Sequence, residues 1–111
     1  MKKSVKVIDL RFRPFFRPLL LDGRKTMTSR TRKFGDPGDQ FLAFGAIFEF
    51  THVFRISVGY MISDCFRQEG CASVQELMKI WNDIHPQTGI VNHQIVWAHI
   101  FRRIDIEPVK K

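Results

Sequence analysis

The octapeptide GRKTMTSR, residues 23–30, is the stretch from which the fold and the chemistry of this chain are best approached. In it, a glycine is followed by two threonines, a serine and three cations within seven residues. Gly23 can end a short helix in the left-handed conformation that glycine adopts without strain. Residues 26–30 are rich in β-branched and polar residues, and such a composition favours a strand. The octapeptide is therefore expected to form a turn that leads into a strand.

Within such a strand, side chains two residues apart share a face. Thr26, Thr28 and Arg30 are therefore expected to point the same way. Lys25 can join them only if the strand begins after it, so that Lys25 lies in the turn. A hydroxyl beside an amine that can take its proton is a nucleophile–base pair, and Thr28 with Lys25 is a candidate for one. The alternative is a polar strand edge that carries a salt bridge.

The basic charge of the chain is concentrated around this octapeptide. Residues 1–33 carry eleven Lys and Arg against two Asp and Glu, whereas residues 34–111 carry seven against nine, so the net charge of +7 comes from the N-terminal third. Clustered cations attract polyanions and release their counterions. A partner that carries phosphate groups, such as RNA or a nucleotide, is therefore expected, and a basic surface that only aids solubility or contacts an acidic protein is the alternative. The residues expected to bind this partner are Arg13, Arg24, Lys25, Thr26, Arg30, Arg32 and Lys33.

Length and composition limit the class of protein. A chain of 111 residues with 44% hydrophobic and 26% charged residues is expected to form one globular domain, with its core at about residues 5–104 and a basic tail at residues 105–111. No apolar run approaches the roughly 18 residues of a membrane span, and two cysteines are too few for a disulfide framework. A cytoplasmic protein without membrane attachment is expected. No histidine pair has metal-ligand spacing, so neither a metal nor a cofactor is expected, and the oligomeric state stays open.

The order of strand-like and helix-like patterns predicts an α+β fold: a curled sheet or β-barrel of five to six mostly antiparallel strands with two to three flanking helices. His52 and His99 fall among aromatic strand residues and are predicted to be core histidines. Strands are predicted at residues 5–12, 26–30, 40–44, 47–57 and 95–104, with a short helix that begins at Pro18, a longer helix from about residue 58 to Gly70, and another helix that begins at the capping box of Ser73 and Glu76 and ends before Pro86.

Glu69 breaks the pattern of the first long helix. Its apolar stripe runs through positions 58, 61, 62, 65 and 66, and the next position on that stripe is 69. A carboxylate stands there instead of a core residue. A carboxylate that is partly buried in this way requires a cationic partner, or its pKa rises through desolvation. Glu69 is therefore a candidate for the wall of a functional pocket, and a solvent-exposed last turn is the alternative.

The octapeptide also resembles a known family. Gly23, Lys25 and Arg30 fit the G-x-K-x-x-x-x-R signature of ASCH domains, small β-barrels related to the PUA domain of RNA-modifying proteins. The resemblance extends over about residues 7–103. It implies a PUA-like fold and a basic cleft that binds RNA or a nucleoside. The Arg- and Phe-rich segment at residues 11–17 departs from the pattern and has no implied role.

A subgroup within that family adds a second hypothesis. Many ASCH domains carry a glutamate where this chain has Thr28, and threonine there resembles the small amidohydrolases that remove the acetyl group from N4-acetylcytidine. The resemblance implies that Thr28 is the nucleophile, Lys25 its base and Glu69 a proton-transfer group, with Arg30 in the wall of the site. The two hypotheses are therefore a binding module for RNA or a modified nucleoside, and a hydrolase of a linear amide.

Overall fold

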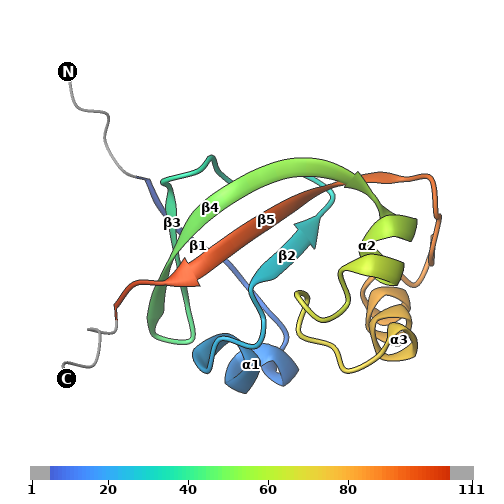
Figure 1. The fold of residues 1–111 in the computed structure, drawn as a ribbon, viewed down its shortest axis with the longest axis horizontal. Coiled ribbons are helices and arrows are strands. Elements are labelled where there is room, and N and C mark those ends of the chain that lie inside the picture. Colours follow the sequence, from blue (N-terminus) through green and yellow to red (C-terminus); the bar gives the residue numbers. More distant parts are fainter. Residues whose placement is uncertain (1–5, 106–111) are drawn as a thin grey trace.

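The described part of the protein folds into one five-stranded sheet and three α-helices. The structure is a computed structural model, and it describes residues 6–105. In sheet order the strands are β1-β3-β4-β5-β2; the β1–β3 pair is parallel and the other pairs are antiparallel (Figure 1). The elements are β1 (Val7–Asp9), a 3₁₀ turn at Pro14–Phe16, α1 (Arg17–Leu21), β2 (Met27–Arg30), β3 (Gln40–Ala43), β4 (Ala46–Ser57), α2 (Val58–Asp64), α3 (Val74–Ile84) and β5 (Ile95–Arg103).

The predicted α+β class, with five to six mostly antiparallel strands and two to three helices, is confirmed. Within the described residues the sheet is curled but open, because β1 and β2 form its two edges and do not pair with each other. The first strand is shorter than the predicted 5–12, and Val5 lies outside the described residues, as does the predicted tail after residue 105. None of the helices in residues 6–105 has the length and apolar character that crossing a bilayer requires.

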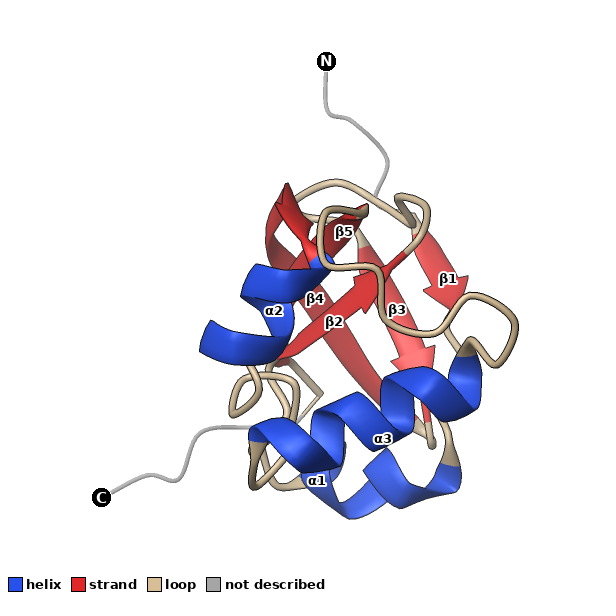
Figure 2. Ribbon diagram, turned by 90° about the vertical axis from the view of Figure 1, so that its right-hand side faces the viewer, coloured by secondary structure: helices blue, strands red, loops and turns tan. Residues whose placement is uncertain are grey.

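Two hydrophobic clusters hold the sheet and the helices together. One is rich in phenylalanine, and in it the ring of Phe41 stacks on Phe48 with centroids 4.9 Å apart. The other packs β2 and β5 against α2 and α3 through residues such as Met61 and Trp81. Figure 2 shows the strands packed above α1 and α3, with α2 beside them. Strand β2 thus has one side on β5 and the other toward the helices.

A β-bulge in β4 turns His52 away from the core. The register of β4 against β5 shifts between Phe50 and His52. One extra residue reverses the alternation of side chains. Even-numbered residues therefore face the core before the bulge and solvent just after it. Phe48 and Phe50 are buried, whereas Phe54 is 40% exposed and His52 also faces solvent. The prediction that His52 is a core histidine is therefore wrong.

The helix predicted to run to Gly70 ends earlier, at Asp64. The residues after it form single turns, in which the amide of Glu69 donates to the carbonyl of Cys65 at 3.0 Å. The carbonyl of Gln68 is used instead by β2, because it accepts from the amides of Thr26 and Met27 at 2.9 and 3.0 Å. This docking explains why the helix does not continue, and it places the 65–70 turn beside the start of β2.

The predicted N-cap at Ser73 is confirmed, and Glu76 reaches back one residue further than predicted, to the amide of Ala72 rather than to that of Ser73. Ser73 Oγ accepts from the amide of Glu76 at 3.1 Å, and Glu76 Oε1 accepts from the amide of Ala72 at 2.8 Å. These bonds satisfy amides at the beginning of the helix that have no partner within it. The helix then buries Leu77 and Trp81 and ends just before Pro86. Its buried face is the one that reaches the candidate site.

Candidate functional site

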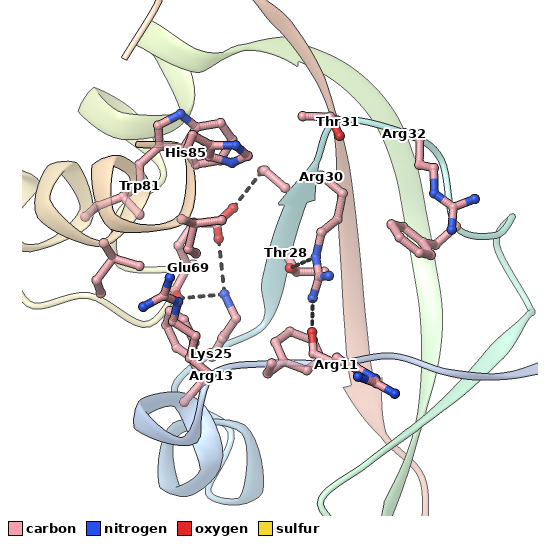
Figure 3. Close-up of a pocket in the computed structure, with 17 residues that line it drawn as sticks. Arg11, Arg13, Lys25, Thr28, Arg30, Thr31, Arg32, Glu69, Trp81 and His85 are labelled. Carbon is pink, nitrogen blue, oxygen red and sulfur yellow. Dashed lines mark hydrogen bonds and ion pairs between the residues drawn. The ribbon is translucent and has the colours of Figure 1, made fainter. Parts of the chain in front are cut away.

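A cavity of about 410 Å³ lies between β2, the segment that precedes α1, the 65–70 turn and α3 (Figure 3). Its wall combines cations with aromatic rings. The charged groups are Arg11, Arg13, Lys25, Arg30 and Arg32 together with a single carboxylate, Glu69, and the rings include Phe12, Phe16, Phe34, Trp81 and His85.

Lys25 and Glu69 form a buried ion pair at the base of this cavity. Lys25 Nζ donates to the backbone carbonyl of Glu69 at 2.8 Å and to its Oε1 at 3.1 Å, and only 3% of Lys25 and 5% of Glu69 is exposed. Gly70 makes this approach possible, because its φ is +93° and a Cβ there would lie 3.0 Å from the Cβ of Lys25. The 65–70 turn can therefore press against Lys25 only with glycine at this position.

Burial lowers the pKa of Lys25 below its usual value, and the attraction of Glu69 offsets part of that change. The desolvation of the ammonium group is the larger of these effects. An amine of this kind releases its proton more readily than an exposed lysine does. Such a shift suits a group that takes up or transfers a proton during a reaction.

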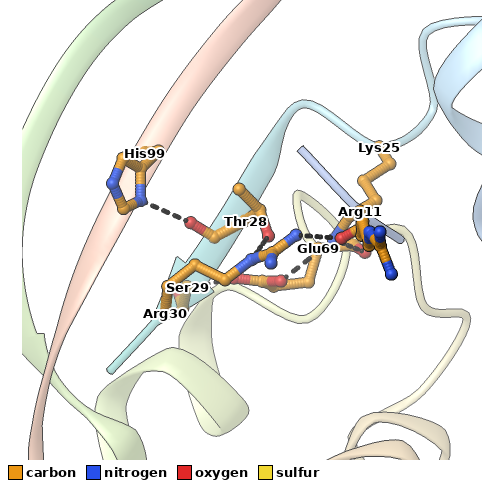
Figure 4. A network of polar contacts seen from close by, with 7 residues as sticks. All are labelled: Arg11, Lys25, Thr28, Ser29, Arg30, Glu69 and His99. Atoms are coloured by element: carbon orange, nitrogen blue, oxygen red, sulfur yellow. Dashed lines mark hydrogen bonds and ion pairs between the residues drawn. The ribbon is translucent and has the colours of Figure 1, made fainter. Parts of the chain in front are cut away.

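Ser29 is the site residue that sequence reasoning missed. Its Oγ donates to Glu69 Oε2 at 2.6 Å, and the side chain is 9% exposed (Figure 4). Since Lys25 binds the other oxygen, both carboxylate oxygens of Glu69 are held in place. Ser29 lies on the opposite face of β2 from Thr28. The alternation that groups Thr28 with Arg30 therefore leaves Ser29 out of the predicted site. A serine that follows the site threonine in an edge strand is the only signal in the sequence.

Thr28 and Arg30 share the other face of β2, as predicted. Arg30 Nε donates to Thr28 Oγ1 at 2.9 Å, and a terminal nitrogen of Arg30 donates to the carbonyl of Arg11 at 2.8 Å. The guanidinium lies 4.7 Å from the ring centroid of Phe12 and 5.5 Å from that of Phe34. Arg30 is thus held between two rings, with its hydrogen bonds directed at the strand and at the N-terminal segment.

His99 supports β2 from β5, and the prediction that it is a core histidine is confirmed. Its side chain is fully buried. The amide of Phe34 donates to Nε2 at 3.1 Å, so Nδ1, which lies 3.2 Å from the carbonyl of Thr28, is the nitrogen that carries the proton. Burial lowers the pKa of His99 despite this hydrogen bond. A neutral imidazole therefore fixes the backbone on which Thr28 stands.

The N-terminal segment at residues 11–13 forms one wall of the cavity. Arg11 and Arg13 line it with Phe12 between them, and Arg13 also donates to the carbonyl of Asp83 on α3 at 3.2 Å. Lys25 Nζ lies 4.3 Å from the ring centroid of Phe16. The Arg- and Phe-rich segment, which the family resemblance left without a role, therefore encloses the buried pair.

Three of the predicted binding residues lie away from the cavity. Arg24 forms a surface ion pair with Asp22 at 2.6 Å, and Lys33 forms one with Asp36 at 2.8 Å. Thr26 joins the 65–70 turn and β5 through its backbone. The cavity does receive the other predicted site residues, which are Arg13, Lys25, Thr28, Arg30, Arg32 and Glu69. Thr28 is not hydrogen-bonded to Lys25 or Glu69 within the described residues.

No group of three or more His, Cys, Asp or Glu side chains in residues 6–105 is arranged to hold a metal ion. The cysteine near the site also has little thiolate character, because burial raises the pKa of Cys71 to about 11. The groups that the cavity offers to chemistry are therefore an amine, a carboxylate, hydroxyls and a guanidinium. This set suits proton transfer and attack by a hydroxyl on a carbonyl.

Comparison with known proteins rests on structure. No protein-family model and no curated protein sequence matches the chain. Its fold is similar to that of an ASCH domain from Lactobacillus crispatus JV V101, at 12% identity over 88% of this chain and 79% of that one, with a TM-score of 0.63. It is also similar to a mutant ASCH protein of Zymomonas mobilis, at 18% identity over 90% and 74% of the two chains, with a TM-score of 0.57. A DUF984 protein from Enterococcus faecalis V583 matches at 15% identity over 100% of this chain and 88% of that one, with a TM-score of 0.62. At these identities the likeness establishes the architecture alone, and this protein has the fold of ASCH domains.

Proposed function

We propose that the protein binds a nucleoside, free or as a unit of RNA, in the cavity beside β2. The observation that carries this proposal is the composition of the cavity: a buried Lys25–Glu69 pair at its base, rings on its walls and arginines at its mouth. Its volume of about 410 Å³ falls within the roughly 300–1,000 Å³ of small-molecule sites. A flat polar base surrounded by sugar and phosphate oxygens matches this distribution of groups.

The walls and the mouth of the cavity would serve different parts of the ligand. Aromatic rings line the walls, among them those of Phe34 and Trp81, and stacking on aromatic rings supports the binding of bases regardless of their sequence. Arg11, Arg13 and Arg32 are exposed at the mouth, where they can meet phosphates without prior desolvation. The basic N-terminal third thus supplies the phosphate contacts, and the buried pair meets polar atoms of the base.

Titration calorimetry with cytidine, N4-acetylcytidine and a short single-stranded RNA tests this function. We expect the RNA affinity to fall steeply with added salt, because cations that neutralise phosphates release counterions, whereas the affinity for the uncharged nucleosides should change little. Arg32→Gln should weaken the RNA complex. The matched control is Arg24→Gln, which removes a cation that lies outside the cavity. A protein that binds none of these ligands at low salt does not have the proposed function.

A second candidate function is hydrolysis of the amide of N4-acetylcytidine. The observation that favours it is the lysine with a lowered pKa, paired with a carboxylate in a cavity that also holds hydroxyl groups. The family resemblance implies that Thr28 attacks the acetyl carbonyl, that Lys25 takes its proton and that Glu69 protonates the leaving amine. Such an arrangement separates a slow hydrolysis into two easier steps.

Release of free cytidine from N4-acetylcytidine, followed by chromatography, tests the second function. We expect turnover by the wild type and its loss in Glu69→Gln, because this change leaves the size of the side chain and removes its ability to accept a proton. The control is Glu49→Gln, whose carboxylate lies on β4 in a surface pair with Arg102. Absence of turnover by the wild type would exclude amide hydrolysis and leave binding as the function.

A further inference from the structure

We propose that Ser29, held by Glu69 and Lys25, is the nucleophile of this cavity and forms an ester with the acyl group of an N-acylated ligand. The proposal rests on the amide hydrolysis put forward above as the second function. It differs from the role that the family resemblance implies for Thr28. It comes from the contacts of β2 with the 65–70 turn.

The geometry around Ser29 is that of an activated hydroxyl. Ser29 Oγ donates to Glu69 Oε2 at 2.6 Å, and Glu69 Oε1 accepts from Lys25 Nζ at 3.1 Å. A nucleophile in hydrogen-bond reach of a base, with that base oriented by a third group, is the structural signature of covalent catalysis. All three residues line the same cavity and all three are buried, so their hydrogen bonds are shielded from bulk water.

Thr28 lacks this arrangement. Its Oγ1 accepts a hydrogen bond from the guanidinium of Arg30 at 2.9 Å, which draws electron density away from the oxygen. Among the residues that the structure describes, no carboxylate or amine accepts the proton of Thr28. The same strand thus presents two hydroxyls to one cavity, and only that of Ser29 has a base in contact.

Lys25 acts as a positioning residue in this scheme. It binds both the backbone carbonyl and Oε1 of Glu69, so the carboxylate cannot rotate away from Ser29 without losing a buried bond. Leu19 in turn fixes Lys25, because its carbonyl accepts from the backbone amide of Lys25 at 2.9 Å. The positive charge of Lys25 also keeps the charge of Glu69 paired while the carboxylate stays in contact with the proton of Ser29.

The reaction proceeds in two balanced halves. Ser29 Oγ bonds to the acyl carbon while its proton passes to Glu69; the C–N bond then breaks, and Glu69 returns the proton to the departing amine. In the second half, water attacks the ester carbon and gives a proton to Glu69. The ester bond breaks, Ser29 recovers that proton, and the carboxylic acid leaves. Water is the only co-reactant.

Mapping of the acyl group decides between the two hydroxyls. The protein is incubated briefly with 4-nitrophenyl acetate or with N4-acetylcytidine, quenched in acid, digested and analysed by mass spectrometry. We expect one acetyl group on Ser29, no acetyl group at position 29 in Ser29→Ala, and retained labelling of Ser29 in Thr28→Val. Release of cytidine from N4-acetylcytidine should fall roughly a hundredfold or more in Ser29→Ala.

Two further variants keep the proposal open to refutation. Ser29→Cys preserves a nucleophile of similar size, and we expect it to form a thioester that hydroxylamine cleaves, even if Ser29→Ala folds poorly. Ser63→Ala, on the exposed surface of α2, should behave as the wild type does. An acetyl group on Thr28, or wild-type release of cytidine by a folded Ser29→Ala, would overturn the proposal and leave amide hydrolysis standing. A wild type that releases no cytidine removes both.

Discussion

Arg24 and Lys25 are neighbours in the sequence and each is paired with a carboxylate, yet their surroundings are opposite. The pair of Arg24 with Asp22 has a nitrogen–oxygen distance of 2.6 Å, and its side chains are 63% and 47% exposed. The pair of Lys25 with Glu69 has a distance of 3.1 Å, with side chains 2% and 6% exposed. The shorter distance belongs to the pair that water screens, so distance alone does not measure the importance of an ion pair.

The pKa values show which effect dominates in each place. At the surface, the hydrogen bond with Asp22 raises the pKa of Arg24, and the same hydrogen bond lowers that of Asp22. In the interior, burial lowers the pKa of Lys25 although Glu69 opposes the change. Attraction between the partners therefore governs the exposed pair, whereas loss of hydration governs the buried one. Removal of one partner should therefore lower the free energy of unfolding much more in the buried pair than in the exposed pair.

The largest expected effect is that of Lys25→Met. The change keeps most of the length of the side chain but leaves the carboxylate of Glu69 buried without its cation. Breaking a buried pair in this way costs about 3–5 kcal/mol, because the remaining charge is desolvated and unpaired. Chemical denaturation followed by circular dichroism measures the free energy of unfolding. A loss no larger than that of an ordinary surface substitution would show that the buried charge is not costly.

The double variant Lys25→Met, Glu69→Gln should be more stable than Lys25→Met alone. It removes both charges, so that no unpaired charge is left buried. The side-chain amide that the second change introduces can still accept from Ser29, so that the hydroxyl keeps a partner. The same denaturation experiment measures both variants. If the double variant is as unstable as the single one, packing around Lys25 rather than charge accounts for the loss.

A smaller, pH-dependent effect is expected from His99. Burial lowers its pKa in the folded protein below the usual 6.5, so as the pH falls below 6.5 the unfolded chain binds a proton that the folded chain does not. The free energy of unfolding should therefore decrease as the pH falls through this range. Burial also lowers the pKa of His85, so the wild-type slope contains both contributions.

Comparison with variants separates the two histidines. His99→Gln, which keeps a donor for the carbonyl of Thr28 and an acceptor for the amide of Phe34, should give a shallower dependence of the unfolding free energy on pH. His85→Gln should remove the other contribution to the slope. An unchanged slope in His99→Gln would mean that His99 does not titrate differently in the two states.

The contrast between Arg24 and Lys25 also shows what the sequence could predict. Spacing along one helical face identified Glu69 as a residue on the buried side, and that holds although α2 ends at Asp64. The capping box at Ser73 and the turn before β2 depend on neighbouring residues, and local patterns are sufficient for them. The class of fold followed from the order of such patterns.

Local sequence patterns do not predict contacts between residues that are far apart in the chain. Ser29 and Glu69 are 40 positions apart, and nothing local to either residue marks them as partners. Arg24 and Lys25 are both cations in one turn. Lys25 is the buried one because its amide binds Leu19 and its ammonium group rests against the ring of Phe16, which are tertiary contacts. The bulge in β4 likewise arises from its pairing with β5.

The smallest expected effect is that of Arg24→Gln, which breaks the surface pair with Asp22. Water and salt solvate both charges whether or not they are paired, so we expect no measurable change in the denaturation midpoint, at low or at high ionic strength. Lys25→Gln, the same replacement one position later, is the matched comparison, and it should destabilise the protein strongly because Glu69 loses its buried cation. Equal losses in the two variants would contradict the assignment of the difference to burial. They would indicate instead that the turn at residues 22–25 depends on both cations for its shape, and the ion pair beneath the cavity would then be no more important to the fold than the one at its surface.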